Sequence, residues 1–322
     1  MIQNIKQIQH NILSRYTKHG RKLPRRKTVD PYAIHISEVM LQQTQVDRVV
    51  PYFHQRMKDF PDYQSLAKAS KTDLLKHRSG LGFNSRALRL QDCAKTIIAK
   101  NWPKIAEKLT KGWLKVIDGD FQIQNSTFKI QNWKVDLTEL RAELQKLPWI
   151  WPYTSATIMA FSRNLPVPVI DTNIRRVLIF LFKLPETITA KELEEFATKI
   201  IPTWKSRDRH NALMDQWALL LTARKTKIKP LSKQSKFEGS DRQVRWWVMK
   251  QLTKATSLSS FVKEGWCEAQ EDLWKGTLGG RDLLTMKKVE EEFPHKNVKD
   301  IVKGLQKEWL IKVSKWVITI AE

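Results

Sequence analysis

Apolar residues recur at helical spacing along most of the chain, in two long stretches that cover residues 30–100 and 137–224. A shorter amphipathic run precedes them, and its apolar face is formed by Ile2, Ile5, Ile8, Ile12 and Tyr16. Breaks that contain Pro or Gly separate the runs, and the longest run, at 34–57, is treated as one helical segment. The pattern predicts an all-α protein with local connections, and a helix rather than a signal peptide at the N-terminus.

Two segments depart from this pattern. In the first, residues 102–132, the segment FQIQNST at 121–127 is echoed by FKIQNWK at 128–134. The alternation is compatible with a β-hairpin, but we favour a short duplicated insertion without a function of its own. The second, residues 237–322, reads as two helices and then a third that leads into two short strands. This order predicts a small winged-helix-like domain, with a solvated basic surface as the alternative.

The composition narrows the class of protein. The 322 residues include 57 Lys and Arg against 33 Asp and Glu, a net charge of +24. Such a charge favours a polyanion partner, most simply nucleic acid, although a merely soluble basic protein is the plainer alternative. No apolar run is long enough to span a bilayer, and we expect the protein in the cytoplasm. Two distant cysteines, Cys93 and Cys267, predict neither a disulfide framework nor a cysteine-rich metal site.

Two acidic residues are candidates for acid–base chemistry. Glu38 lies in a predicted helix among apolar neighbours, where burial would raise the pKa of its carboxyl group and let it hold a proton near neutral pH. Asp171 follows an apolar run and opens the next helix. Each has a plainer interpretation: Glu38 as a surface acid, and Asp171 as a helix cap that accepts from nearby backbone N–H groups. Capping does not exclude catalysis.

Residues 144–161 predict two helices joined by a tight turn. A hairpin of this kind can present backbone N–H groups at a helix N-terminus to a phosphate, which requires close approach of the backbone. Glycine suits such a turn, and the tryptophans at 149 and 151 do not.

Several segments together resemble the helix-hairpin-helix base-excision DNA glycosylases, and most closely the MutY-like adenine DNA glycosylases. They are LPRRKTVDPYAIHISEVMLQQTQVDRVVPYF, GLGFNSRALRL, LPWIWPYTSATI, VIDTNIRRVL and NALMDQWALLLTARK. The resemblance covers about residues 1–236 apart from the insertion, and its most specific motif is SEVMLQQTQV. It implies a base-excision repair enzyme that flips adenine out of a mismatch with guanine or 8-oxoguanine and hydrolyses its N-glycosidic bond.

The resemblance also implies roles for individual residues. Glu38 matches the acid that protonates the adenine ring, and Asp171 matches the carboxylate that stabilises the cationic sugar. This pairing is chemically sound, because one acid must donate a proton while the other remains an anion. The resemblance implies further DNA-binding or base-binding positions at Arg26, Leu41, Gln42, Gln43, Phe83, Trp149, Trp151, Tyr153, Asn173 and Asp215.

Tyr153 bears on the type of reaction. Relatives that cut the strand through a Schiff base carry a lysine at this hairpin position, so the phenol implies hydrolysis without strand cleavage. Two alternatives remain open: a thymine-mismatch glycosylase of the same superfamily, and a DNA-binding relative with impaired catalysis.

The chain departs from the family pattern at several points. The family's iron–sulfur loop has four cysteines, but residues 225–236 contain none, so we expect no cofactor and a loop that binds the DNA backbone through lysines. Arg25 stands where the family has a tryptophan. The C-terminal part does not resemble the reader of oxidised guanine that many relatives carry. The preference between guanine and 8-oxoguanine opposite adenine is therefore open.

Tryptophan stands where glycine is expected at Trp133, Trp149, Trp151, Trp204, Trp217, Trp246 and Trp309. The chain has 13 tryptophans and only 11 glycines. An indole in a left-handed turn costs about 1–2 kcal/mol, and at residues 149 and 151 its bulk would block approach of the DNA backbone. We hypothesise a gene that encodes glycine by UGA and has been translated with UGA as tryptophan. Codons UGG at 149 and 151 would rule this out.

These observations together predict an all-α, two-lobed helix-hairpin-helix glycosylase with a small C-terminal winged-helix-like domain. The predicted lobes are residues 29–163 with the hairpin and the insertion, residues 1–28 with 164–236, and the C-terminal domain at 237–322. Glu38 and Asp171 are expected to face each other across the cleft between the lobes. We expect a monomer that binds mismatched double-stranded DNA and contacts no membrane.

Overall fold

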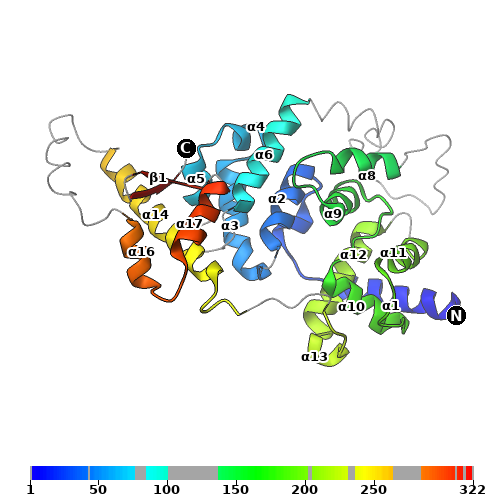
Figure 1. Ribbon diagram of the computed structural model, residues 1–322. Coiled ribbons are helices and arrows are strands. Elements are labelled where there is room, and N and C mark those ends of the chain that lie inside the picture. The colour runs from blue at the N-terminus through cyan, green and yellow to red at the C-terminus, as the bar shows by residue number, and fades with distance from the viewer. Residues whose placement is uncertain are drawn as a thin grey trace. The chain divides into compact units, whose positions relative to one another are not determined.

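The computed structural model describes residues 2–42, 44–76, 85–100, 137–201, 205–230, 236–263, 284–308, 310–314 and 317–320. Helices dominate these ranges, and their strands form one antiparallel hairpin (Figure 1). The prediction of an all-α fold is confirmed. The insertion at 102–132 lies outside the described residues. Within the described ranges, no helix is both long and apolar enough to cross a bilayer.

The chain divides into two compact units, Met1–Gln43 with Cys93–Lys233 and Thr44–Asp92 with Gln234–Glu322. The first unit contains α1 (Ile2–His19), the 3-10 turn η1 (Pro24–Lys27), α2 (Pro31–Leu41), α8 (Leu137–Gln145), α9 (Pro152–Arg163), α10 (Thr172–Phe182), α11 (Ala190–Lys199), α12 (Ser206–Asp215), the π-helical turn η2 (Gln216–Leu220) and α13 (Ala223–Thr226). Helix α6 (Ser85–Ala99) crosses the boundary. The boundaries of the three predicted domains stay a prediction.

Packing in the first unit centres on α2, α9 and α12. Helix α2 packs on α9, α9 packs on α12, and α12 packs in turn on α1 and α10. Buried aliphatic side chains from α1, α10 and α12, such as Ile12, Val177 and Leu213, belong to one core cluster. The three central helices therefore have fixed positions relative to one another. Glu38 lies on α2 and Asp215 at the end of α12, whereas Asp171 lies at the start of α10, which packs on α12.

Helix α2 is buried almost all round. Its N-cap, Asp30, accepts from the N–H groups of Tyr32 and Ala33, and Pro31 occupies the first position, where its missing N–H costs nothing. Every residue from Tyr32 to Met40 is buried, which is typical of a helix in the middle of a core. Glu38 is therefore an interior acid and not a surface one.

The single helical segment predicted at 34–57 is wrong. Helix α2 ends at Leu41, because Gln42 leaves the helix with φ −56° and ψ 113°, and α3 (Val46–Asp59) begins four residues later. Gln42, Thr44 and Gln45 of the LQQTQ motif lie in this break. The apolar pattern continues across it, so the pattern alone could not locate the break.

The predicted hairpin is present at α8 and α9, which pack against each other (Figure 1). Between them the Ile150 N–H donates to the Leu147 carbonyl at 3.3 Å and closes a β-turn. Pro148 occupies its second position, and Trp149, in the third, has a φ of 67°. A proline followed by a positive φ is the signature of a type II turn, whose third position favours glycine.

The expected strain from tryptophan is confirmed at Trp149 and not at the other described positions. Trp151 has φ −85° and ψ 168°, an extended backbone that any residue adopts. Trp217 and Trp246 lie in helical turns without a positive φ. Trp149 is 41% exposed and Trp151 is 62% exposed. Their indole rings therefore add bulk to the surface of the turn, as the sequence predicted. Trp133, Trp204 and Trp309 lie outside the described residues, and the UGA hypothesis stays a prediction.

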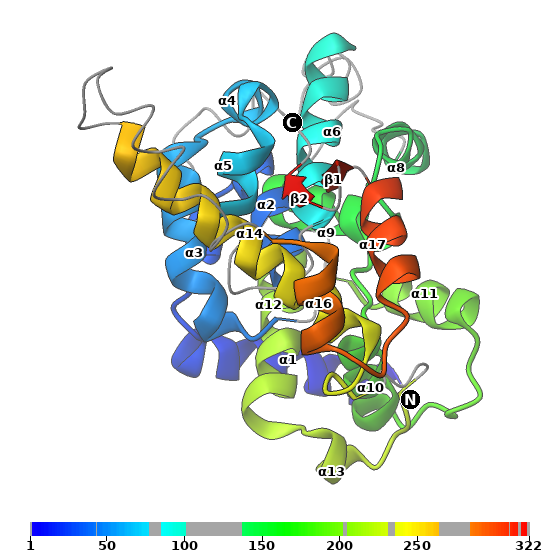
Figure 2. The ribbon, with the colours of Figure 1, turned by 60° about the vertical axis from the view of Figure 1, so that its left-hand side comes forward.

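The second unit contains α3, α4 (Tyr63–Lys68), α5 (Lys71–Lys76), α14 (Asp241–Lys263), α16 (Met286–Glu292), α17 (Val298–Lys307), β1 (Ile311–Ser314) and β2 (Val317–Ile320). A bridge from Thr285 to Val317 adds a short third segment to the β1–β2 hairpin. Figure 2 shows α14, α16 and α17 around this hairpin. The order helix, bridge, two helices and hairpin is that of the predicted winged-helix-like domain. Leu75 of α5 belongs to the same core as these elements.

Candidate active site

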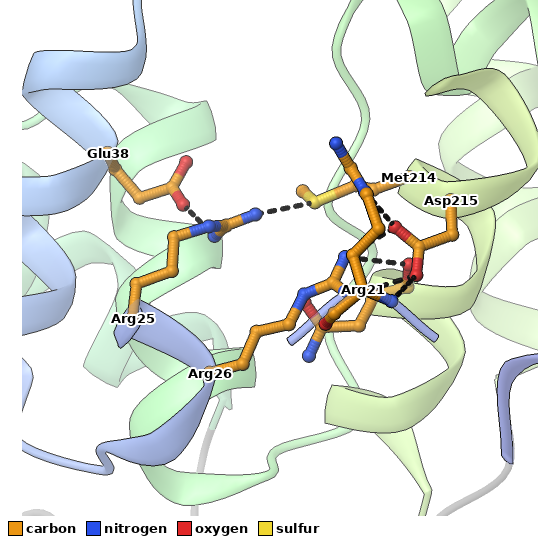
Figure 3. Close-up of polar contacts among 7 residues, drawn as sticks. Arg21, Arg25, Arg26, Glu38, Met214 and Asp215 are labelled. Atoms are coloured by element: carbon orange, nitrogen blue, oxygen red, sulfur yellow. Dashed lines mark hydrogen bonds and ion pairs between the residues drawn. The ribbon is translucent and has the colours of Figure 1, made fainter. Parts of the chain in front are cut away.

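Glu38 lies in a polar cluster inside the first unit. Its side chain is only 4% exposed. Its Oε1 accepts a hydrogen bond from Nη1 of Arg25 at 2.6 Å, and its Oε2 accepts one from the Tyr153 hydroxyl at 3.1 Å. Figure 3 shows the Arg25 guanidinium directed at this carboxylate. Side chains from η1 and α9 therefore hold both oxygens of an acid on α2.

The surroundings of Glu38 favour its protonated form. Burial raises the pKa of Glu38 above its ordinary value, and this effect outweighs the lowering by Arg25 and by the hydrogen bond from Tyr153. The negative charge of Asp171 raises the pKa further. Glu38 also lies in the last turn of α2, where the helix dipole disfavours an anion. The direction is the one predicted from the sequence.

Asp171 is the N-cap of α10. Its Oδ1 accepts from the Ile174 N–H at 2.6 Å, so the cap interpretation is confirmed. Burial raises the pKa of Asp171 above its ordinary value, and hydrogen bonds from the N–H groups of Ile174 and Asn173 offset this rise only in part. The N-terminal end of α10 favours a negative charge here, in contrast to the end of α2 at Glu38. The helix geometry therefore suits Glu38 to hold a proton and Asp171 to hold a charge.

Glu38, Tyr153 and Asp171 share one electrostatic environment. The charge of Asp171 acts on both of the other groups. Burial raises the pKa of Tyr153 well above its ordinary value, and the charges of Glu38 and Asp171 raise it further. The phenol therefore keeps its proton and donates a hydrogen bond to Glu38. Glu38 and Asp171 thus belong to one compact unit, and their charges interact within it.

Arg26 and Asp215 form a second ion pair beside this cluster. Two nitrogens of Arg26 reach the two oxygens of Asp215, each at 2.8 Å, and Nε of Arg21 adds a contact at 2.6 Å (Figure 3). Although burial raises the pKa of Asp215, these hydrogen bonds hold it below its ordinary value. A bidentate pair of this kind fixes orientation as well as charge. It anchors η1 to the end of α12, and so it positions Arg25, the neighbour of Arg26.

His210 supports the segment that leads to Asp171. Its Nε2 accepts from the Val169 N–H at 3.0 Å, while Nδ1 donates to the Ser206 carbonyl at 2.6 Å. Burial lowers the pKa of His210 to about 3, so the ring is neutral and can accept at Nε2. It therefore ties the backbone two residues before Asp171 to α12. The sequence contained no signal for this contact, because the partners are far apart along the chain.

The other predicted site residues lie at element ends. Leu41 and Gln42 end α2, and Asn173 lies in the first turn of α10 beside Asp171. Gln43 and Phe83 lie outside the described residues. The roles of all these residues in binding stay predictions.

Arg25 is the site residue that sequence reasoning missed. The resemblance marked it as a substitution of a tryptophan but did not identify its partner. Its guanidinium also donates to Sδ of Met214 at 3.2 Å and lies 5.7 Å from the centre of the Phe161 ring. The missed signal was its charge, because a buried arginine requires an acid nearby.

No metal site accompanies the cluster within the described part of the chain, where no three His, Cys, Asp or Glu side chains converge. The iron–sulfur cluster that the resemblance implies does not fit this chain. It needs four cysteines, and the sequence has two, of which Cys93 is buried in α6.

Comparison with known proteins identifies the family. The sequence pattern of the HhH-GPD superfamily of base excision DNA repair proteins matches residues 36–203, just over half of the chain. The chain belongs to this superfamily. The match begins within α2 and includes all of α9 and α10, so it covers Glu38, Tyr153 and Asp171. The family prediction is therefore confirmed.

Curated relatives of this HhH-GPD chain carry the name adenine DNA glycosylase. One, from Buchnera aphidicola subsp. Baizongia pistaciae (strain Bp), is 33% identical over 214 residues, which cover 65% of this chain and 51% of the relative. Another, from Homo sapiens, is 28% identical over 77% of this chain and 41% of its own. The chain spans about half the length of the first relatives that it matches.

Solved structures support the HhH-GPD fold. A thermostable thymine-DNA glycosylase has a TM-score of 0.55 and 24% identity over 69% of this chain and 90% of its own. A trapped endonuclease III–DNA covalent intermediate has a TM-score of 0.52 and 16% identity over 72% of this chain and 91% of its own. At these identities the likeness shows the fold alone.

Proposed function

We propose that this HhH-GPD protein is a monofunctional DNA glycosylase that hydrolyses the N-glycosidic bond of adenine mispaired with guanine or 8-oxoguanine. One observation carries the proposal: Glu38 is buried, Asp171 is partly buried in the same unit and acts on it electrostatically, and the two lie at helix ends of opposite polarity. The adenine DNA glycosylases among the relatives support adenine as the base.

The proposed reaction begins once the adenine nucleotide has left the base stack. Glu38 donates its proton to a ring nitrogen of the base as the bond to the sugar breaks, and the bonding electron pair leaves with the neutral adenine. The ionised Asp171 stabilises the positive charge that develops on the sugar. Water then adds to the sugar, and its released proton restores the acid.

Tyr153 supports hydrolysis rather than strand cleavage. Its phenol holds Oε2 of Glu38 at 3.1 Å, and burial raises its pKa well above the ordinary value. A group that retains its proton is a poor nucleophile, and a phenol cannot form the Schiff base that a lysine would form. The function therefore ends with an abasic site in an intact strand.

The substrate in this proposal is double-stranded DNA. The net charge of +24 suits a phosphate backbone, and the N-terminus of α9 at the hairpin turn is suited to a phosphate contact. With two cysteines in the sequence, we infer that the protein works without an iron–sulfur cluster. The monomeric state and the cytoplasmic location stay predictions.

A duplex assay tests the function. Under single-turnover conditions, duplexes with A:G, A:8-oxoguanine, T:G and A:T pairs are incubated with the full chain and then treated with alkali, which cuts at abasic sites. We expect cleavage only after alkali and only in the strand that carries mispaired adenine. Cleavage of the thymine strand in T:G would instead identify a thymine-mismatch glycosylase. Binding without cleavage in any duplex would identify a catalytically impaired relative.

Replacing Trp149 by Gly is expected to tighten duplex binding by roughly tenfold, because it removes the indole from the turn that the DNA backbone must approach. The loss of about 1–2 kcal/mol of backbone strain should instead raise the free energy of unfolding, because the strain is present in the free protein. Trp149→Ala removes the bulk but retains the strain, and Trp151→Gly removes bulk where no strain exists. A titration of all three variants with the mismatched duplex measures the effect of the bulk, and thermal unfolding of the same variants measures the effect of the strain. Equal affinity of wild type and the Trp149→Gly, Trp151→Gly double variant would contradict the prediction.

A further inference from the structure

The guanidinium of Arg25 is held in place from several sides. It donates to Oε1 of Glu38 at 2.6 Å and to Sδ of Met214 at 3.2 Å, and it lies 5.7 Å from the centre of the Phe161 ring. Its side chain is 11% exposed. The Arg26–Asp215 pair fixes the turn from which it extends (Figure 3). Arg25 is therefore a fixed partner of Glu38 and not a mobile surface charge.

We propose that Arg25 is a positioning residue that leaves Oε2 of Glu38 as the oxygen that carries the transferable proton and stabilises the carboxylate that remains after transfer. This inference rests on the proposed function. Neither the family match nor the relatives assign a role to this arginine, and the resemblance of the sequence implies a tryptophan at its position.

The hydrogen-bonding capacities of the two partners of Glu38 lead to this assignment. A guanidinium has only donors and stays charged in proteins, so the oxygen that faces it must act as an acceptor. A proton on Oε1 would point at another donor. A hydroxyl can donate or accept, so Tyr153 can turn to accept from a protonated Oε2 or give way to the base. The two oxygens of Glu38 are equivalent in an isolated carboxyl group. Here Oε1 can only accept a hydrogen bond, whereas Oε2 can carry the proton.

Proton transfer then balances without another reactant. The proton on Oε2 moves to a ring nitrogen while the bond between base and sugar breaks and its electron pair goes to the base. Glu38 becomes a carboxylate whose Oε1 still accepts from Arg25, and whose Oε2 again accepts from Tyr153. The positive charge of Arg25 thus favours the state in which the proton has been given away.

Arg25 therefore affects catalysis in two opposite ways. It makes Glu38 a stronger acid, which helps donation, and it reduces the fraction that is protonated at high pH. The groups that face Glu38 from other elements are Arg25 on η1, Tyr153 on α9 and Asp171 at the start of α10. Arg25 is the positive charge among them, so its removal should raise the pKa of Glu38.

The test is the pH dependence of adenine release in single turnover, for wild type and for Arg25→Met, Arg25→Gln and Arg25→Lys. In the Met and Gln variants, the fall in rate at high pH, the basic limb of the profile, should move to higher pH. When each rate is divided by the maximum rate of the same variant, the neutral variants should exceed wild type about tenfold or more on the basic limb. Arg25→Lys keeps the positive charge, so its basic limb should lie at the same pH as that of wild type. Arg15→Met, which removes an exposed arginine from α1, is the matched control. A basic limb that is unchanged in both neutral variants would overturn the proposal.

A second measurement does not depend on activity. The carboxyl carbon of Glu38 is followed by 13C NMR through a pH titration, and its resonance is assigned by its absence in Glu38→Gln. The midpoint should be higher in Arg25→Met and Arg25→Gln than in wild type. A shifted midpoint with no base release by wild type would contradict the proposed function but would support the effect of Arg25 on the pKa of Glu38. Base release with an unshifted midpoint would retain the function and refute the role of Arg25.

Discussion

The Glu38→Gln variant is expected to release adenine about a hundred to ten thousand times more slowly than wild type, the usual contribution of a positioned general acid. Glutamine has nearly the same shape, and its carbonyl oxygen can still accept from Arg25 at the Oε1 position. It cannot donate a titratable proton to the base. Single-turnover rates on the A:G duplex measure the effect.

Two controls keep this result interpretable. Circular dichroism should show unchanged helical content, because the substitution neither creates a cavity nor leaves Arg25 without an acceptor. Affinity for the mismatched duplex should stay within about threefold of wild type, because the general acid acts on the transition state more than on the bound ground state. A Glu38→Gln rate within tenfold of wild type would show that another group donates the proton.

Asp171→Asn should slow adenine release by about a hundredfold or more with little change in stability. Asparagine caps helices about as well as aspartate, so the hydrogen bond from the Ile174 N–H is retained. Only the negative charge is lost, and charge stabilisation of a transition state is commonly worth two to three orders of magnitude. Release rates and thermal unfolding of the same preparation give both quantities.

Asp171→Ala is the matched comparison. It loses the charge and the cap together, so it should be as slow as Asp171→Asn and also less stable by about 1 kcal/mol. The asparagine variant has a further signature: since the charge of Asp171 raises the pKa of Glu38, its removal should move the basic limb of the rate profile to lower pH. Full activity of Asp171→Asn would show that Asp171 acts only as the N-cap of α10 and not in catalysis.

Local sequence patterns accounted for most of the helices in the described residues and for the hairpin. Helical periodicity and capping depend on neighbours within one or two turns, so they can be recognised without any tertiary contact. The strained turn was foreseeable for the same reason, because a type II turn with Pro148 in its second position requires a positive φ at the next residue, Trp149. The raised pKa of Glu38 followed from its apolar neighbours.

Contacts between distant residues were not predictable in this way. Arg25 and Glu38 lie on different elements, and Tyr153 reaches the same carboxylate from a helix 115 residues further along the chain. The break after Leu41 was also hidden, because the apolar pattern runs through it. Hydrophobic patterning specifies which face of a helix is buried, but not which partner it packs against. The packing of α2, α9 and η1 therefore determines that an arginine faces the acid, and with it the position of the proton.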